Sequence, residues 1–184
     1  YNGCGDVEPL TINYEILYVQ QKGTIVRDLS YSFYTNIYTG TDLSVLSNHL
    51  FTGKTIIEWT YAEEPFKIVW AVRSDGALLS LTYLKEQEVA GWAQHATDGT
   101  FTSITSIQEG QEDAVYVVVE RQGIKFVERM HTRLMEDVSD AFFVDCGLSY
   151  SGPPLTSFSG LDHLEGREVA ILGDGNVFPN QLVL

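Results

Sequence analysis

One pattern occurs three times in this sequence and constrains the fold more than any other feature. In each copy an apolar run leads through a polar turn ending in glycine to a second apolar run; the copies are residues 17–29, 69–81 and 116–128. Their turn glycines, Gly23, Gly76 and Gly123, are spaced at about one propeller-blade length. We therefore expect antiparallel hairpins arranged as propeller-like blades. The alternative is a plain antiparallel meander, whose hairpins resemble one another because they share turn chemistry.

Two further strands are predicted between these hairpins, at residues 55–61 and 100–107, which gives each blade three or four strands. The many aromatic and β-branched side chains favour such half-buried sheet surfaces, so a mainly β fold is predicted. Within the second hairpin, Asp75-Gly76 is a typical type I′ turn sequence. A β-branched residue in place of Gly76 is therefore expected to destabilise this hairpin.

One short helix is predicted over residues 42–50, between the first two hairpins. Thr41 or Asp42 can cap its first turn, and Gly53 can end it. Its apolar face would consist of three leucines: Leu43, Leu46 and Leu50. Such a helix between blades is expected to fill space rather than to bind a ligand.

The amino-acid composition of the chain changes near residue 145, which predicts a domain boundary. Glycines and prolines interrupt the chain between residues 146 and 160. Residues 1–145 are therefore expected to form the propeller-like blades, and residues 146–184 a linker and the start of a small β-barrel. That barrel would open with a hairpin from residues 167–172 to Val177-Phe178. Because the chain starts without Met and ends within an apparent strand, we expect it to be a fragment of a longer polypeptide.

The chain is strongly acidic. Eleven Lys and Arg against twenty-five Asp and Glu give a formal net charge of −14, which repels phosphates, so DNA is expected to pass without specific binding. The two cysteines, Cys4 and Cys146, lack metal-type spacing and are predicted to be free thiols of a chain assembled in a reducing cytoplasm. No stretch approaches the roughly 20 apolar residues of a membrane span, and no signal segment opens the sequence, so a soluble protein is expected.

The sequence indicates no enzymatic site. No two histidines have the spacing that places a pair on one helix face; they are His49, His95, His131 and His163. The acidic pairs Glu63-Glu64 and Glu112-Asp113 could suggest a glycosidase, but that reaction needs two carboxylates facing each other across a cleft, so solvated turn residues are expected. Residues 173–175 are typical of a hairpin turn with no following helix to hold a phosphate. We predict no catalytic, cofactor-binding or metal-ligating residue and no cofactor.

Three segments resemble a known family, the tail hub or nozzle proteins of short-tailed bacteriophages and prophages. They are residues 41–51, residues 70–83 continuing into 88–92, and residues 160–172 followed by Asp174-Gly175. The third segment is similar to the opening of a small β-barrel inserted in that family, which has been compared with the first catalytic-cysteine half-domain of ubiquitin-activating enzymes. No catalytic cysteine is carried over, because Cys146 precedes the barrel pattern.

The resemblance implies a non-enzymatic virion structural protein, located in the phage tail and assembled in the bacterial host cytoplasm. Its copies would form a ring around a DNA exit conduit and contact adaptor, fibre or spike proteins. The alternative is a carbohydrate- or receptor-binding β module, in which exposed tryptophans stack on sugars; the candidates are Trp59, Trp70 and Trp92. Of these, Trp70 is expected in the core and Trp92 half exposed. A propeller glycosidase, a third class, would need acidic residues gathered at the axis.

Overall fold

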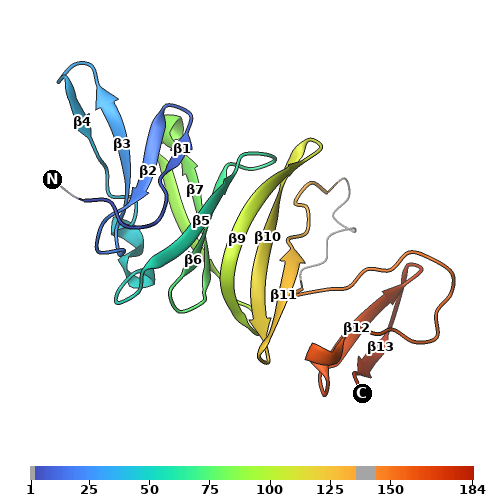
Figure 1. Ribbon diagram of the computed structural model, residues 1–184. Helices are drawn as coiled ribbons and strands as arrows, with labels where there is room; N and C mark the ends of the chain where they lie inside the picture. Colours follow the sequence, from blue (N-terminus) through green and yellow to red (C-terminus); the bar gives the residue numbers. More distant parts are fainter. Residues whose placement is uncertain (1–2, 136–143) are drawn as a thin grey trace.

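The computed structural model describes residues 3–135 and 144–184, which form four antiparallel sheets (Figure 1). The first sheet is ordered β1 (Leu10–Ile12), β2 (Glu15–Val19), β3 (Val26–Ser32) and β4 (Ile37–Thr39). The second contains β5 (Ile56–Ala62), β6 (Ile68–Arg73), β7 (Leu78–Leu84) and β8 (Val89–His95). The third contains β9 (Thr100–Glu109), β10 (Glu112–Arg121) and β11 (Ile124–Arg129), and the fourth is a hairpin of β12 (Glu168–Gly173) and β13 (Asn176–Leu182). With 50% strand and 7% helix, the predicted mainly β fold is confirmed.

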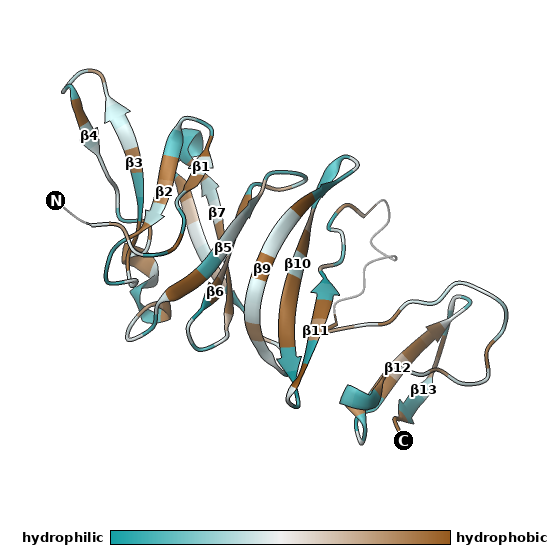
Figure 2. Ribbon diagram, viewed as in Figure 1, coloured by the Kyte–Doolittle hydropathy of each residue, from teal (hydrophilic) through white to brown (hydrophobic). Residues whose placement is uncertain are grey.

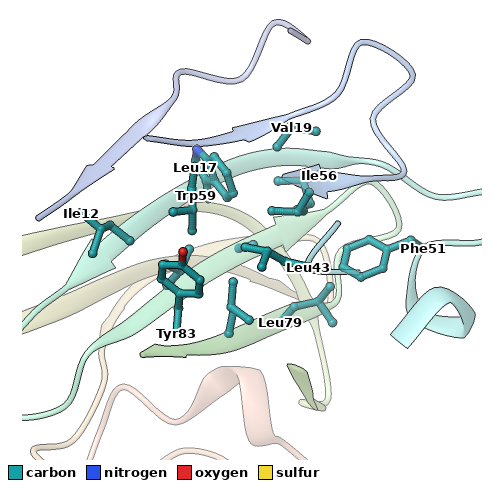
Figure 3. Packing of buried hydrophobic residues seen from close by; sticks show 13 residues of the cluster. Ile12, Leu17, Val19, Leu43, Phe51, Ile56, Trp59, Leu79 and Tyr83 are labelled. Atoms are coloured by element: carbon teal, nitrogen blue, oxygen red, sulfur yellow. The ribbon is translucent and has the colours of Figure 1, made fainter. Parts of the chain in front are cut away.

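The first three sheets are stacked, and the second lies between the other two. Every residue of β6 is buried, because alternate side chains point to opposite faces of the strand and both faces are covered. Val69 and Ala71 join a core shared with the first sheet, whereas Trp70 and Val72 join a core shared with the third. Figure 3 shows the first of these cores, including Leu17 from β2 and Leu79 from β7.

The chain moves from sheet to sheet in the manner of propeller blades. Each sheet is a meander whose strands follow sequence order, and the link from its last strand leads to the first strand of the next sheet. The first strands β1, β5 and β9 consequently lie beside one another along the stack (Figure 1). In Figure 2 the middle of β10 is largely apolar, while the turns at both of its ends are hydrophilic.

The three predicted hairpin turns are confirmed at Gly23, Gly76 and Gly123, all with positive φ. The turn type predicted for Asp75-Gly76 is wrong, because Gly76 has a φ of +79° but Asp75 is not among the residues with positive φ. The Gly76 amide bonds to the Arg73 carbonyl at 2.8 Å and the Arg73 amide to the Ala77 carbonyl at 2.9 Å. This is a type I turn followed by a glycine bulge. A type I′ turn occurs instead at Gln122-Gly123, where φ is 50° and 80°.

The predicted helix over residues 42–50 is corrected to a short 3₁₀ segment, η1 (Val45–Leu50). Asp42 forms a β-bridge with Arg27, and its carboxylate accepts hydrogen bonds from the amide and hydroxyl of Ser44. This local bonding competes with a regular helical start, and Ser44 provides no side-chain cap. The expected leucine face is absent, because Leu46 is 89% exposed while Leu43 lies in the core before the helix begins.

The C-terminal segment contains the expected hairpin, and no closed barrel is formed by the residues that the structure describes. The two-residue turn Asp174-Gly175 has a φ of 48° and 78°, which is a type I′ geometry. Two further 3₁₀ segments are η2 (Lys85–Gln87) and η4 (Asp162–Leu164). Neither these nor η1 is long and apolar enough to cross a membrane, and the described ranges contain no other helix that is.

Candidate functional site

The junctions between successive sheets carry the most distinctive geometry of this protein. At the first junction the Gly23 carbonyl accepts a hydrogen bond of 3.4 Å from the Ile56 amide at the start of β5. At the second, the Gly76 carbonyl accepts a bond of 2.9 Å from the Phe101 amide in β9. The repeated turn thus holds the first strand of the following sheet by its backbone.

Both glycines are also close to a threonine of the following sheet. A Cβ atom at Gly23 would lie 2.5 Å from Cγ2 of Thr55, and one at Gly76 would overlap Cγ2 of Thr100. The third turn differs, because a Cβ at Gly123 would meet nothing within 4 Å. At the first two positions of the repeat, glycine is therefore favoured both by the positive φ and by the close approach of a threonine from the next part of the fold.

The second and third sheets each contain a buried arginine at the end of the strand that leads into the turn. Arg73 forms a bidentate pair with Asp75 at 2.6 and 2.9 Å, and its Nη1 donates to the Leu50 carbonyl at 2.7 Å. Through this bond it ties the turn to the link that enters its own sheet. The hydrogen bond from Arg73 is the main cause that holds the pKa of the Asp75 carboxyl well below its usual range.

Arg121 repeats this arrangement in the third sheet. It pairs with Glu128 at 2.8 and 3.1 Å, and its Nη1 donates to the Asp98 carbonyl at 2.8 Å. The hydrogen bond to Glu128 raises the pKa of the Arg121 guanidinium, so the cation is firmly held. Neither arginine was predicted from the sequence, although each is a basic residue at the end of the strand that leads into the turn.

A polar cluster connects the first sheet to the second, and it consists of Glu15, Asp28, Tyr83 and Lys85. Asp28 is almost completely buried in β3. Its carboxylate accepts hydrogen bonds from Lys85 and from the hydroxyl of Tyr83, the latter at 3.2 Å. The Tyr83 hydroxyl also contacts Glu15, and Lys85 lies 3.4 Å from Glu15. Four side chains from β2, β3, β7 and η2 therefore satisfy one another.

Three members of this cluster, Asp28, Tyr83 and Lys85, have shifted pKa values. Burial raises the pKa of Asp28, but the hydrogen bonds from Lys85 and from the Thr41 amide outweigh it, so the pKa lies below its ordinary value. Burial lowers the pKa of Lys85, and its hydrogen bond and attraction to Asp28 reverse this to a net increase. Burial and the hydrogen bond to Glu15 raise the pKa of Tyr83. None of these three groups is therefore suited to exchange a proton near pH 7.

The structure brings the two acidic pairs of the sequence together, in a structural role. Carboxylate Oδ2 of Asp113 accepts hydrogen bonds from the amides of Glu63 and Glu64, at 2.7 and 3.1 Å. Burial and the nearby carboxylates raise the pKa of Tyr61 to about 12. The adjoining cavity measures about 40 Å³, which has room for water but not for a sugar ring. These acids stabilise the contact between the second and third sheets.

The tryptophans do not form an exposed stacking surface. Trp59 and Trp70 are buried, and Trp92 is half-buried, as expected for the last two. The Trp59 indole donates to the Glu8 carbonyl at 2.6 Å, and the Trp92 indole donates to the Leu43 carbonyl at 2.9 Å. A group of exposed aromatic side chains that was not predicted from the sequence lies instead on the β3–β4 hairpin; its members are Tyr31, Phe33, Tyr34 and Tyr38.

The histidines lie in different surroundings. His49 and His131 are exposed, whereas His95 contacts Ser80 at 2.8 Å and His163 packs against Phe126 with the two rings tilted. Within residues 3–135 and 144–184 no group of three metal-ligating side chains is found. Both cysteines are free; burial raises the pKa of the Cys146 thiol, so a reactive thiolate is not favoured there.

A large cavity of about 1340 Å³ separates the β10–β11 turn from the C-terminal segment. Its walls include Arg121, Cys146 and Phe178, and an ion pair of 2.8 Å between Arg167 and Asp98 joins the two sides. This volume exceeds the range of typical small-molecule sites. The cavity therefore indicates a loose contact rather than a shaped ligand pocket.

No family model and no curated protein matches this chain.

Proposed function

We propose that this chain is a structural, non-enzymatic component of a bacteriophage tail, belonging to the hub or nozzle that forms the DNA exit conduit and attachment platform. The observation that carries the proposal is the repeated junction between sheets. Gly23 and Gly76 hold the first strand of the following sheet in the same way. Such junctions fasten the sheets into a rigid stack, and a structural component needs this rigidity.

The use of the buried charges supports the same role. Arg73, Arg121 and Asp28 are each buried, and each is engaged in a contact that fastens a turn or joins two sheets. Side chains committed in this way are unavailable for substrate binding. The chemistry of the described residues therefore favours a scaffold.

We further propose that copies of the chain surround the tail axis and contact adaptor, fibre or spike proteins of the virion. A ring requires heterologous interfaces, in which different surfaces of two copies meet. The net charge of −14 would keep DNA mobile within such a conduit by repelling its phosphates. Assembly would take place in the cytoplasm of the bacterial host.

Immunogold electron microscopy tests this proposal. Antibodies raised against the purified chain are applied to particles of the phage or prophage that encodes it, before and after mild disruption of the tail. Gold at the tail, close to the DNA exit, is the expected result. Gold confined to the capsid, or particles without label in both states, would contradict the proposal.

A second candidate function is binding of a host carbohydrate or receptor, which the β3–β4 hairpin favours. Tyr34 is 99% exposed there and Phe33 is 83% exposed, and exposed aromatic rings on β surfaces stack on sugars. A glycan array with the unmodified chain and with Tyr34→Ser distinguishes this candidate. Binding that is lost in the variant would favour the receptor module, whereas an array without signal would favour the scaffold.

A further inference from the structure

Strand β8 forms an open edge of the second sheet, because β7 pairs with it on one side only. The two strands pair continuously over seven residues, from Leu78↔His95 to Leu84↔Val89, without a bulge. The β6–β7 ladder begins with the bond from the Arg73 amide to the Ala77 carbonyl, and in an antiparallel sheet the bonded pairs alternate. Counting from there, three residues of β8 direct their backbone N–H and C=O groups away from β7: Ala90, Trp92 and Gln94.

This edge lacks the devices that normally protect a sheet. Residues 89–95 contain no charged side chain and no proline, and Ala90, Gly91 and Ala93 leave the outer backbone uncovered. The other outer edges differ: β4 is only three residues long, and β11 carries Lys125 and Arg129. A long, flat and uncharged edge is a template for pairing with another strand. Among these three outer edges, β8 is therefore the one suited to that pairing.

The edge is also held in place before any partner arrives. The Trp92 indole donates to the Leu43 carbonyl and packs edge-on against Phe51, with ring centroids 4.9 Å apart. At the end of the strand, His95 contacts the Ser80 hydroxyl at 2.8 Å. A strand fixed by its own side chains loses little conformational freedom on binding, which favours association.

The charges around β8 select the kind of partner. Glu86 and Glu88 precede the strand, and Lys85 beside them is engaged with Asp28 and Glu15. At the other end of the strand Asp98 is paired with Arg167, and Arg133 lies near His95. Each copy of the chain carries a net charge of −14, so pairing of two copies through β8 would bring like charges together. This repulsion disfavours self-pairing. A segment with a basic end beside Glu86 and Glu88 would be attracted instead.

We propose that the free edge of β8 binds an extended segment of another protein by strand addition, and that this segment carries lysine or arginine at the end that lies beside Glu86 and Glu88. The backbone groups of Ala90, Trp92 and Gln94 supply the pairing, and the flanking carboxylates supply the preference for a basic partner. This interaction surface is independent of the proposed role in a phage tail. It would serve any assembly in which the stack must capture a second polypeptide.

Binding of a designed peptide to the purified chain tests the proposal by fluorescence anisotropy. The probe is a labelled peptide of alternating threonine and valine with two lysines at each end. One control peptide has glutamates in place of the lysines, and a second keeps the lysines but is N-methylated at alternate backbone amides, which removes its pairing groups. We expect saturable binding of the first peptide and at least tenfold weaker binding of both controls.

Two variants of the chain locate the site. Gln94→Pro removes an outward N–H without removing a bond to β7, so it should weaken binding at least tenfold, whereas the matched variant Gln94→Thr should bind like the unmodified chain. Changing Glu86 and Glu88 to lysine should reverse the preference toward the glutamate peptide. The N-methylated control keeps the test valid even if Gln94→Pro fails to fold.

Three results would overturn the proposal. The first is equal binding of the N-methylated and the unmodified lysine peptides, which would show general attraction to an acidic surface. The second is absence of saturable binding. The third is a dimer in analytical ultracentrifugation that Gln94→Pro converts to a monomer, because β8 would then pair with a second copy.

Discussion

Replacing Gly76 by valine tests the junction between the second and third sheets. Gly76 has a φ of +79°, which costs a β-branched residue about 1 to 2 kcal/mol. The new Cβ would also overlap Cγ2 of Thr100 and lie 3.1 Å from its Cβ. Because the χ1 angle of threonine is restricted, the start of β9 must shift to relieve this overlap. The shift would break the bond from the Phe101 amide to the Gly76 carbonyl, which contributes about 0.5 to 1.5 kcal/mol. We expect a total loss of about 1.5 to 3.5 kcal/mol in unfolding free energy.

Gly123→Val is the matched control, because Gly123 has nearly the same φ, +80°, but no atom within 4 Å of its Cβ position. This variant should lose only the conformational part, about 1 to 2 kcal/mol. Urea denaturation followed by tryptophan fluorescence measures both variants, with the slope m checked for two-state unfolding. The difference between the two losses isolates the contact with Thr100.

A double variant refines the test. Thr100→Ser removes the methyl group that a new Cβ at Gly76 would meet, so Gly76→Ala should cost less in that background than in the unmodified chain. If Gly76→Val were no more costly than Gly123→Val, and Thr100→Ser gave no relief, the junction between the sheets would not depend on this contact. The reasoning that links the glycine repeat to sheet stacking would then be refuted.

Three further predictions concern charge, pH and chain connectivity. Labelled duplex DNA should show no retention by the chain at about 20 mM salt, where screening is weak, and saturable binding there would contradict a passive conduit. Because the pKa of Asp28 is lowered on folding, its contribution to stability is present above the unfolded value of 3.8 and is lost as the pH falls through the lower folded value. Asp28→Asn should therefore lower stability at pH 7 by about 1 to 3 kcal/mol and reduce the acid sensitivity of thermal unfolding below pH 4; an unchanged acid limb would contradict this. Limited proteolysis should cleave first between residues 146 and 160, and first cuts within residues 56–129 would contradict the predicted boundary.

Local features of the fold were predictable because they depend on neighbours in the sequence. The hairpins at Gly23, Gly76 and Gly123 follow from short apolar runs separated by a residue that tolerates positive φ. The strands predicted at residues 55–61 and 100–107 follow from the same reasoning, and the structure confirms both as β5 and β9. The helix near residue 45 was less predictable, because bonds from Ser44 to the Asp42 carboxylate compete with regular helical bonds.

The candidate site could not be predicted, because its contacts join residues that are distant in the sequence. Nothing near Asp28 indicates that Lys85, in the following sheet, neutralises its buried carboxylate. Arg73 and Arg121 read as exposed charges at strand ends, although each is buried against a carbonyl of the link entering its sheet. Such pairs form only once the sheets stack, since burial is what makes a partner necessary.

The alternation of apolar residues and the turn glycines determined that this chain folds into antiparallel hairpins. The alternation of apolar residues does not by itself show which faces of a sheet are covered. A strand with one buried face and a strand with two buried faces differ only in what packs against them. The tertiary structure decided that β6 is buried on both faces and that β8 is left with an open edge. It also placed Thr100 against Gly76, which turned a local turn residue into part of the contact between sheets.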